Sequence, residues 1–124
     1  MTAVFTPFYE RYGEDFPWWV PEDPSPMERE LRRELVPGHP LYGKELKALA
    51  RSSARDDVLF TDGNRFFIVH LTWGRGRERF PQFWEFQDLE GALSYIEQDF
   101  LYWRPKSYFL KQILEAFHEK HLVF

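Results

Sequence analysis

Two apolar runs joined by an Asp-Gly turn constrain the fold of this chain more than any other feature. The runs "VLFT" (58–61) and "RFFIVHLTW" (65–73) flank "DGN" at residues 62–64, and this arrangement is the strongest short-range signal for a β-hairpin. Side chains in the second run alternate between two faces. One face carries Phe67, Val69, Leu71 and Trp73, and the other carries Phe66, Ile68, His70 and Thr72. Because both faces are largely apolar, we expect an inner strand that is covered on both sides.

Further strands are expected on both sides of this hairpin. Apolar and polar residues alternate over residues 46–51, which predicts a strand before the hairpin. After the loop "GRGRERFPQ", residues 83–87 predict a short fourth strand. Because all the connections are short, the three or four strands should form an antiparallel meander.

Three helices are predicted around the strands. Ser25, Pro26 and Glu28 combine an N-cap, a first-turn proline and the glutamate of a capping box, so a helix should begin at Ser25 and end at Pro37-Gly38. Asp88 should cap a helix over residues 89–102, and Ser107 should cap a last one. The apolar stripes of the three helices carry Met27, Leu31 and Leu35, then Leu93, Ile96 and Phe100, and finally Phe109, Leu110, Ile113, Leu114 and Phe117. The order of elements predicts an α+β fold in a single domain over residues 1–124, with the N-terminal helix and two C-terminal helices packed on the sheet.

Residues 1–25 form a proline- and tryptophan-rich segment that we expect to be irregular and docked on the domain. The stretch "FPWWVPEDPSP" contains four prolines, which favour an extended or polyproline-like backbone. Adjacent side chains in extended backbone point in different directions. We therefore expect only one of Trp18 and Trp19 to be deeply buried, and removal of residues 1–25 to lower stability.

Composition excludes several classes of site. The chain has 124 residues, no cysteine and a formal net charge of −4, so disulfides, thiolate catalysis and cysteine-ligated metals are absent. The acidic charge argues against general nucleic-acid binding. No stretch is long and apolar enough for a membrane span, and the N-terminus lacks the pattern of a signal peptide. The expected location is the cytoplasm, no cofactor is predicted, and the oligomeric state is left open.

His70 is the one candidate catalytic residue. A histidine on a covered strand must find a hydrogen-bond partner, such as a carbonyl, a hydroxyl or a carboxylate. Catalysis would also need a nucleophile or an acid–base companion, and Thr72 is the one residue nearby in sequence on the same face. Asp56 and Asp57 should point to opposite faces at a strand start. We therefore favour a structural role for His70, and no acidic residue is left that needs a functional explanation.

The other histidines predict no metal site. His39 precedes a proline in a turn and has no evident companion. Glu115, His118 and His121 are spaced three apart, which can in principle ligate a metal, but the pattern occurs once and near the chain end. A solvated helix end is the favoured interpretation.

Tryptophan and arginine supply the candidate binding surface, because these residues dominate binding hot spots. "GRGRER" at 74–79 lacks the lysine and the Ser/Thr of a phosphate-binding loop. A solvated loop is the favoured interpretation, and the alternative is that its arginines bind an acidic patch on a protein partner, which suits them better than DNA. The predicted binding residues are Trp18, Trp19, Trp73, Arg75, Arg77, Arg79 and Trp84.

An ordered set of short motifs lies in the middle of the chain, namely "GHPLYG" (38–43), "DDVLF" (56–60), the Asp-Gly turn and "VHLTW" (69–73). In this set the chain resembles a group of small, uncharacterised bacterial proteins in which a GHPLYG-like turn precedes strands ending in VHLTW. The resemblance covers residues 38–73. It implies a bacterial, single-domain, cytosolic protein, and it supplies neither an activity nor catalytic residues.

Two functions remain open from the sequence. The first is a non-enzymatic protein-binding module, for example of the immunity or antitoxin type. The second is a small hydrolase-like enzyme that uses His70. A concave pocket with His70 exposed beside a carboxylate would favour the enzyme, whereas a covered His70 and a flat aromatic patch would favour the module.

Overall fold

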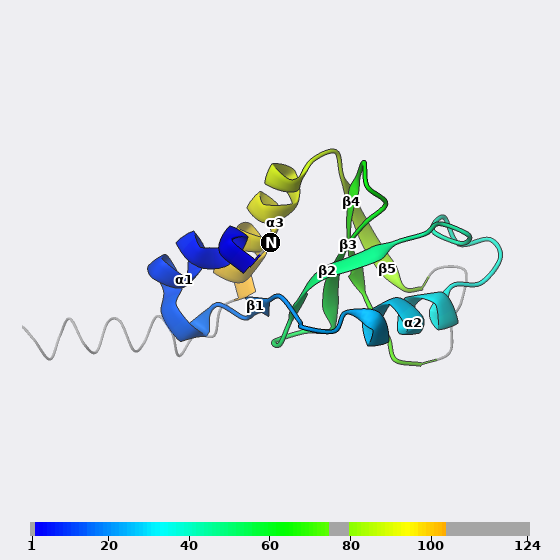
Figure 1. Cartoon of the computed structure of the whole chain (residues 1–124), viewed down its shortest axis with the longest axis horizontal. Helices are drawn as coiled ribbons and strands as arrows, with labels where there is room; N and C mark the ends of the chain where they lie inside the picture. The colour runs from blue at the N-terminus through cyan, green and yellow to red at the C-terminus, as the bar shows by residue number, and fades with distance from the viewer. Residues whose placement is uncertain (1, 75–79, 104–124) are drawn as a thin grey trace, which may run out of the picture.

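The computed structural model describes residues 2–74 and 80–103. The fold is α+β, with a five-stranded antiparallel sheet between helices (Figure 1). In chain order the elements are η1 (Thr2–Phe5), α1 (Thr6–Tyr12), η2 (Gly13–Asp15), β1 (Trp18–Trp19), α2 (Ser25–Glu34), β2 (Lys47–Ser52), β3 (Asp57–Thr61), β4 (Phe66–His70), β5 (Gln82–Phe86) and α3 (Leu89–Trp103).

The predicted meander is confirmed, with one strand more than expected. The strands lie in the order β1-β2-β3-β4-β5, and each neighbouring pair is antiparallel. The extra strand is β1, in which Trp18 pairs with Ser52 and Trp19 with Arg51. In the β3–β4 turn, Gly63 has a φ of 95°, which favours glycine. The Asp62 carboxylate accepts the N–H groups of the two residues after Gly63, at 2.9 and 2.7 Å.

The sheet separates two apolar cores, as the two-faced pattern of the hairpin predicts. One core lies between the sheet and α2, and the other lies between the sheet and α3 (Figure 1). The side chains of successive β4 residues pack alternately in the two cores, with Phe67 and Val69 on the α2 side and Ile68 on the α3 side. The strand β4 is therefore an inner strand, buried on both faces.

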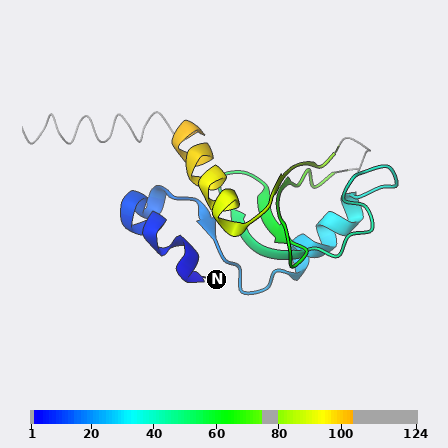
Figure 2. The same ribbon diagram turned by 90° about the horizontal axis from the view of Figure 1, so that it is seen from above.

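The expectation of an irregular, extended segment is wrong for residues 2–15, which are helical. Pro7 lies in the first turn of α1, where proline is tolerated. These helices lie beside α3 (Figures 1 and 2), where the Tyr12 hydroxyl donates to Glu97 at 2.7 Å. The aromatic side chains of Phe5, Phe8 and Phe16 are buried in the core on the α3 side.

The extended part begins after η2, and its two tryptophans face opposite sides of the sheet. Trp18 is 4 % exposed and belongs to the core on the α3 side, whereas Trp19 is 41 % exposed. This agrees with the expectation that one ring only is deeply buried.

The helix α2 begins at Ser25 as predicted, but the predicted capping box does not form. The Pro24 carbonyl accepts the N–H groups of Met27 and Glu28, at 3.1 and 3.3 Å, and no side chain caps the helix. The Ser25 hydroxyl bonds to Asp23 instead. The Glu28 carboxylate accepts the Ala48 N–H at 2.8 Å, beside a register shift in β2 that a sequence pattern does not reveal. The apolar stripe of α2 is buried as expected.

The helix α3 has the predicted cap and most of the predicted buried face, although Leu93 is only partly buried. The Asp88 carboxylate accepts the Gly91 N–H at 2.8 Å, and Ala92, Ile96 and Phe100 are buried. The helix predicted from Ser107, with Glu115, His118 and His121, lies outside the described residues, as do Arg75, Arg77 and Arg79. No helix in the described part of the chain is long and apolar enough to cross a membrane.

Candidate functional site

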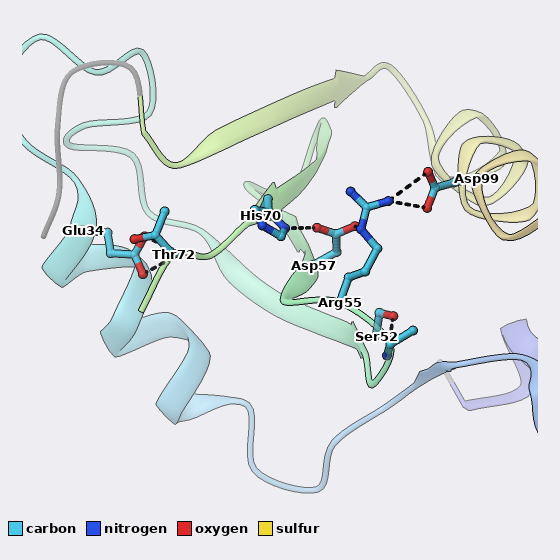
Figure 3. Close-up of polar contacts among 8 residues, drawn as sticks. Glu34, Ser52, Arg55, Asp57, His70, Thr72 and Asp99 are labelled. Carbon is cyan, nitrogen blue, oxygen red and sulfur yellow. Dashed lines mark hydrogen bonds and ion pairs between the residues drawn. The ribbon is translucent and has the colours of Figure 1, made fainter. Parts of the chain in front are cut away.

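His70 and Asp57 form a hydrogen-bonded pair at the end of the central hairpin. The register of β3 and β4 places Asp57 directly opposite His70, and His70 Nδ1 lies 2.8 Å from Asp57 Oδ1 (Figure 3). The Asp57 side chain is buried, whereas the His70 side chain is 38 % exposed. A carboxylate, one of the expected types of partner for His70, therefore fills this role, and it comes from Asp57 rather than from a residue nearby in sequence. The pairing depends on strand register, which residue spacing alone does not give.

Arg55 and Asp99 extend this pair towards α3. Arg55 Nη1 lies 3.4 Å from both carboxylate oxygens of Asp99, and Arg55 Nε lies 3.8 Å from Asp57 Oδ2 (Figure 3). Burial raises the pKa of the Asp99 carboxyl, and the Arg55 charge opposes that shift. Burial also raises the pKa of the Tyr95 phenol, with smaller contributions from Asp99 and Asp57. One guanidinium thus holds two carboxylates from different elements, which ties α3 to the hairpin.

The His70–Asp57 pair has half of the geometry of a general base. When Asp57 accepts a hydrogen bond from Nδ1–H of His70, the lone pair on Nε2 of the same ring remains available to another group. Among residues 2–74 and 80–103, no hydrogen bond to Nε2 is found and no nucleophile is presented to it. The Ser52 hydroxyl accepts the Ala54 N–H at 3.2 Å, and the Thr72 hydroxyl donates to Glu34 at 2.7 Å. The part of the chain that is described also has no group of three or more residues suited to a metal ion.

Glu34 is a fully buried carboxyl that the sequence interpretation missed. Its oxygens accept the N–H and hydroxyl of Thr72, at 2.9 and 2.7 Å (Figure 3), and also the Trp73 N–H at 2.8 Å. Burial raises the pKa of Glu34, and a hydrogen bond with Glu30 adds to the shift. Glu34 lies three residues after Leu31 and seven after Met27, a spacing that places it on the apolar face of α2. That spacing is the signal that could have found it.

These hydrogen bonds fix the chain where it leaves β4. Trp73 has a φ of 54°, a left-handed conformation that costs free energy for a bulky residue. The Glu34 carboxyl holds that backbone in place, and the Trp73 indole remains exposed. The role of Glu34 is therefore to position this part of the chain.

His39 has partners for both ring nitrogens, contrary to the expectation that it has no companion. The ring is buried. Its Nε2 lies 2.8 Å from the Pro81 carbonyl oxygen, and Nδ1 accepts the Leu41 N–H at 3.0 Å. His39 therefore joins the turn at residues 38–43 to the start of β5, which is a structural role.

A small pocket opens between β1, the end of β2 and the last turns of α3; we call it the Trp103 pocket. Its volume is about 120 Å³. Trp103 is 62 % exposed and forms one wall, and the Arg55 guanidinium lies 5.6 Å from the centre of its ring. The lining residues are Asp15, Pro17, Trp18, Ser52, Ala54, Arg55, Asp99, Phe100 and Trp103. Arg55 thus joins the pocket to the His70–Asp57 pair, although His70 is not part of the lining.

The predicted binding tryptophans do not form one surface. Trp18 and Trp19 lie on β1 and Trp84 lies on β5, at opposite edges of the sheet. Trp84 is partly buried and stacks on Tyr95 with a ring separation of 5.6 Å. Trp19 and Trp73 are the exposed members of the set within the described residues.

Sequence reasoning missed two exposed aromatic residues at the end of α3. Tyr102 and Trp103 follow directly after the buried stripe of this helix, and both are more exposed than Trp19 or Trp73. The signal that could have found them is a pair of large aromatic residues off the apolar face of a helix.

Comparison of this chain with protein-family models, with curated proteins and with solved structures finds no match to any of them.

Proposed function

We propose that this protein is a non-enzymatic module that binds another protein through the Trp103 pocket. The supporting observation is an open pocket of about 120 Å³ with aromatic walls and a charged rim. Small-molecule sites usually have volumes of roughly 300–1,000 Å³, so this pocket suits a single apolar side chain of a partner better than a substrate. Trp103 is the exposed aromatic residue of this lining, and a tryptophan at the edge of such a pocket is typical of binding hot spots.

Charged residues at the rim of the pocket help to orient the partner in this contact. Arg55 contacts both Trp103 and Asp99, and Asp15 is a further charged residue of the lining. Charges at the edge of an interface steer encounter and disfavour wrong partners more than they add affinity. An acidic cytoplasmic protein of the immunity or antitoxin type is one example of such a module.

Substituting Trp103 with Ser is expected to weaken partner binding by roughly 30-fold or more, as for a central hot-spot residue. The partner is first identified by affinity purification from the native host, and its Kd is then measured with purified components. Tyr102→Ser is the matched control, since Tyr102 is exposed and does not line the pocket. Loss of the Trp103–Arg55 contact costs about 0.5–1 kcal/mol, so both variants should remain folded. A Kd that is the same for Trp103→Ser and Tyr102→Ser would contradict the proposed surface.

The second candidate function is a small hydrolase-like enzyme that uses His70. The observation that favours it is the 2.8 Å contact between His70 and Asp57, with the histidine ring partly open to solvent. In this function Asp57 orients the ring and His70 Nε2 accepts a proton from water.

The His70→Gln variant separates the two functions. We expect it to lower the free energy of unfolding by about 1–3 kcal/mol, because the buried Asp57 carboxylate loses its histidine partner. Partner binding should be unchanged in the folded variant, since His70 does not line the Trp103 pocket. Urea unfolding and the Kd measurement above check both statements. Loss of ester hydrolysis against a panel of activated esters, at unchanged partner binding, would instead establish the enzyme.

A further inference from the structure

Arg51 carries a charge that no carboxylate matches within the described residues. It lies on β2 opposite Trp19, on the α2 side of the sheet. Arg51 Nη1 contacts the Met27 sulfur at 3.9 Å, and Arg51 Nε is buried without a hydrogen-bond partner. None of the ion pairs found among residues 2–74 and 80–103 includes Arg51.

This arrangement differs from that of the other arginines with fixed side chains. Arg11, Arg33, Arg55 and Arg65 each have a carboxylate partner, namely Glu97, Glu30, Asp99 and Glu85. Those pairs place a carboxylate against the charge of each guanidinium. Arg51 is partly buried instead, and the acceptor near its guanidinium is the Met27 thioether, which is a weak one.

The guanidinium of Arg51 is also held in a fixed orientation. Its Cζ lies 5.7 Å from the centre of the Trp19 ring, and that ring is partly exposed on the edge strand β1. A guanidinium has five N–H donors and no acceptor. A buried donor without a partner is uncommon in native proteins and calls for a ligand or another explanation. A guanidinium can donate two parallel hydrogen bonds to one oxyanion such as a carboxylate.

We propose that Arg51 and Trp19 bind a carboxylate side chain in an acidic segment of a protein partner. The proposal rests on the protein-binding function above and adds a second contact on the other side of β1. Trp18 lines the Trp103 pocket, and Trp19, its neighbour in sequence, covers Arg51. A partner that meets the β1 edge therefore reaches both contacts, one with an apolar side chain and one with a carboxylate.

A carboxylate suits this site better than a phosphate. The described part of the site supplies a single guanidinium. The whole chain has a net charge of −4. A dianion is repelled more strongly than a monoanion by these negative charges, whereas a planar carboxylate matches one guanidinium.

The test uses the full chain and two short peptides, Ac-Glu-Glu-Glu-Glu-NH₂ and Ac-Gln-Gln-Gln-Gln-NH₂. Nuclear magnetic resonance follows the Arg51 Nε–H cross peak, which is assigned by its absence in Arg51→Gln. We expect a saturable shift with the glutamate peptide and none with the glutamine peptide. Arg51→Gln should weaken binding of the glutamate peptide about tenfold or more. Arg29→Gln is the control, because Arg29 is exposed on α2 and its loss changes the net charge equally.

Several outcomes would overturn the proposal. These are equal shifts with both peptides, no saturable shift at millimolar glutamate peptide, tighter binding of inorganic phosphate, or the same affinity in Arg51→Gln and Arg29→Gln. If Arg51→Gln does not fold, Trp19→Leu replaces it, with a several-fold loss expected. Trp103→Ser should bind the glutamate peptide normally. Failure of the Trp103 pocket and failure of the carboxylate site therefore give different results.

Discussion

Removing residues 1–24 is expected to lower the melting temperature by about 15 °C or more. The deletion takes away Phe5, Phe16 and Trp18, which are buried in the core on the α3 side. Loss of one buried aromatic side chain typically costs about 3–5 kcal/mol. Each kcal/mol corresponds to roughly 3–5 °C in a chain of this size. Thermal unfolding followed by circular dichroism and tryptophan fluorescence measures the change.

Point variants separate the packing contribution from the other effects of the deletion. Trp18→Ala should cost about 3–5 kcal/mol, whereas Trp19→Ala should cost about 1 kcal/mol or less, the value of an exposed cation–π contact. The two residues are neighbours in β1, so they form a matched pair. A deletion variant that melts at the same temperature as the full chain would show that the segment contributes nothing to stability.

Replacing Glu34 with Ala is expected to lower the free energy of unfolding by about 3 kcal/mol. The substitution removes the acceptor of two backbone N–H groups and one hydroxyl, on Thr72 and Trp73. Each stranded donor costs about 1 kcal/mol or more. Glu34→Gln keeps one acceptor oxygen and should cost less. Urea unfolding measures both variants, and Glu85→Ala, which breaks a surface pair with Arg65, should cost about 1 kcal/mol or less.

The pH dependence of stability gives a second measurement on Glu34. Burial and the hydrogen bond with Glu30 raise the pKa of Glu34 above its usual value of 4.5, so the folded state holds a proton more tightly than the unfolded state. The stability from this group is complete below the unfolded pKa and is lost as pH rises through the folded pKa. Burial acts to raise the pKa of Glu30, but its hydrogen bonds with Arg33 and Glu34 outweigh burial and lower it.

The raised pKa of Asp99 produces a loss of stability in the same direction as Glu34. The contribution of Glu34 is therefore the difference between the wild type and Glu34→Gln. Stability of the wild type should fall more steeply with rising pH through this window than stability of the variant. Parallel curves would contradict the assignment.

The local parts of the fold could be predicted from the sequence. The Asp-Gly hairpin, the start of α2 and the Asp88 cap depend on residues within a few positions of one another, so spacing and residue type reveal them. The helices of residues 2–15 were not predicted, because the four prolines in residues 16–26 favour extended backbone and that expectation was applied to the whole segment. The strand β1 has two residues and exists through its pairing with Ser52 and Arg51, which no local pattern encodes.

The candidate sites were predicted less well, because they depend on contacts between distant elements. His70 was identified, but its partner Asp57 became visible through strand register alone. Glu34 was not identified from the sequence, because its role depends on hydrogen bonds with Thr72, which lies 38 positions away in the chain. Trp103 lines a pocket with Trp18, which is 85 positions away in the chain. Burial of only one of Trp18 and Trp19 was predicted correctly, but not which of the two is buried, and the contact between Trp19 and Arg51 was not predicted.

The sheet that separates the two cores has a consequence for how this protein can change over time. Val69 and Ile68 are neighbours in the chain, yet they pack in different layers. Close-packed interiors transmit strain, so substitutions at chain neighbours such as Ile68 and Val69 are expected to interact. Substitutions in separate layers that lie more than about 7–10 Å apart and share no contacts should combine independently. At such distant positions the two layers can therefore change separately.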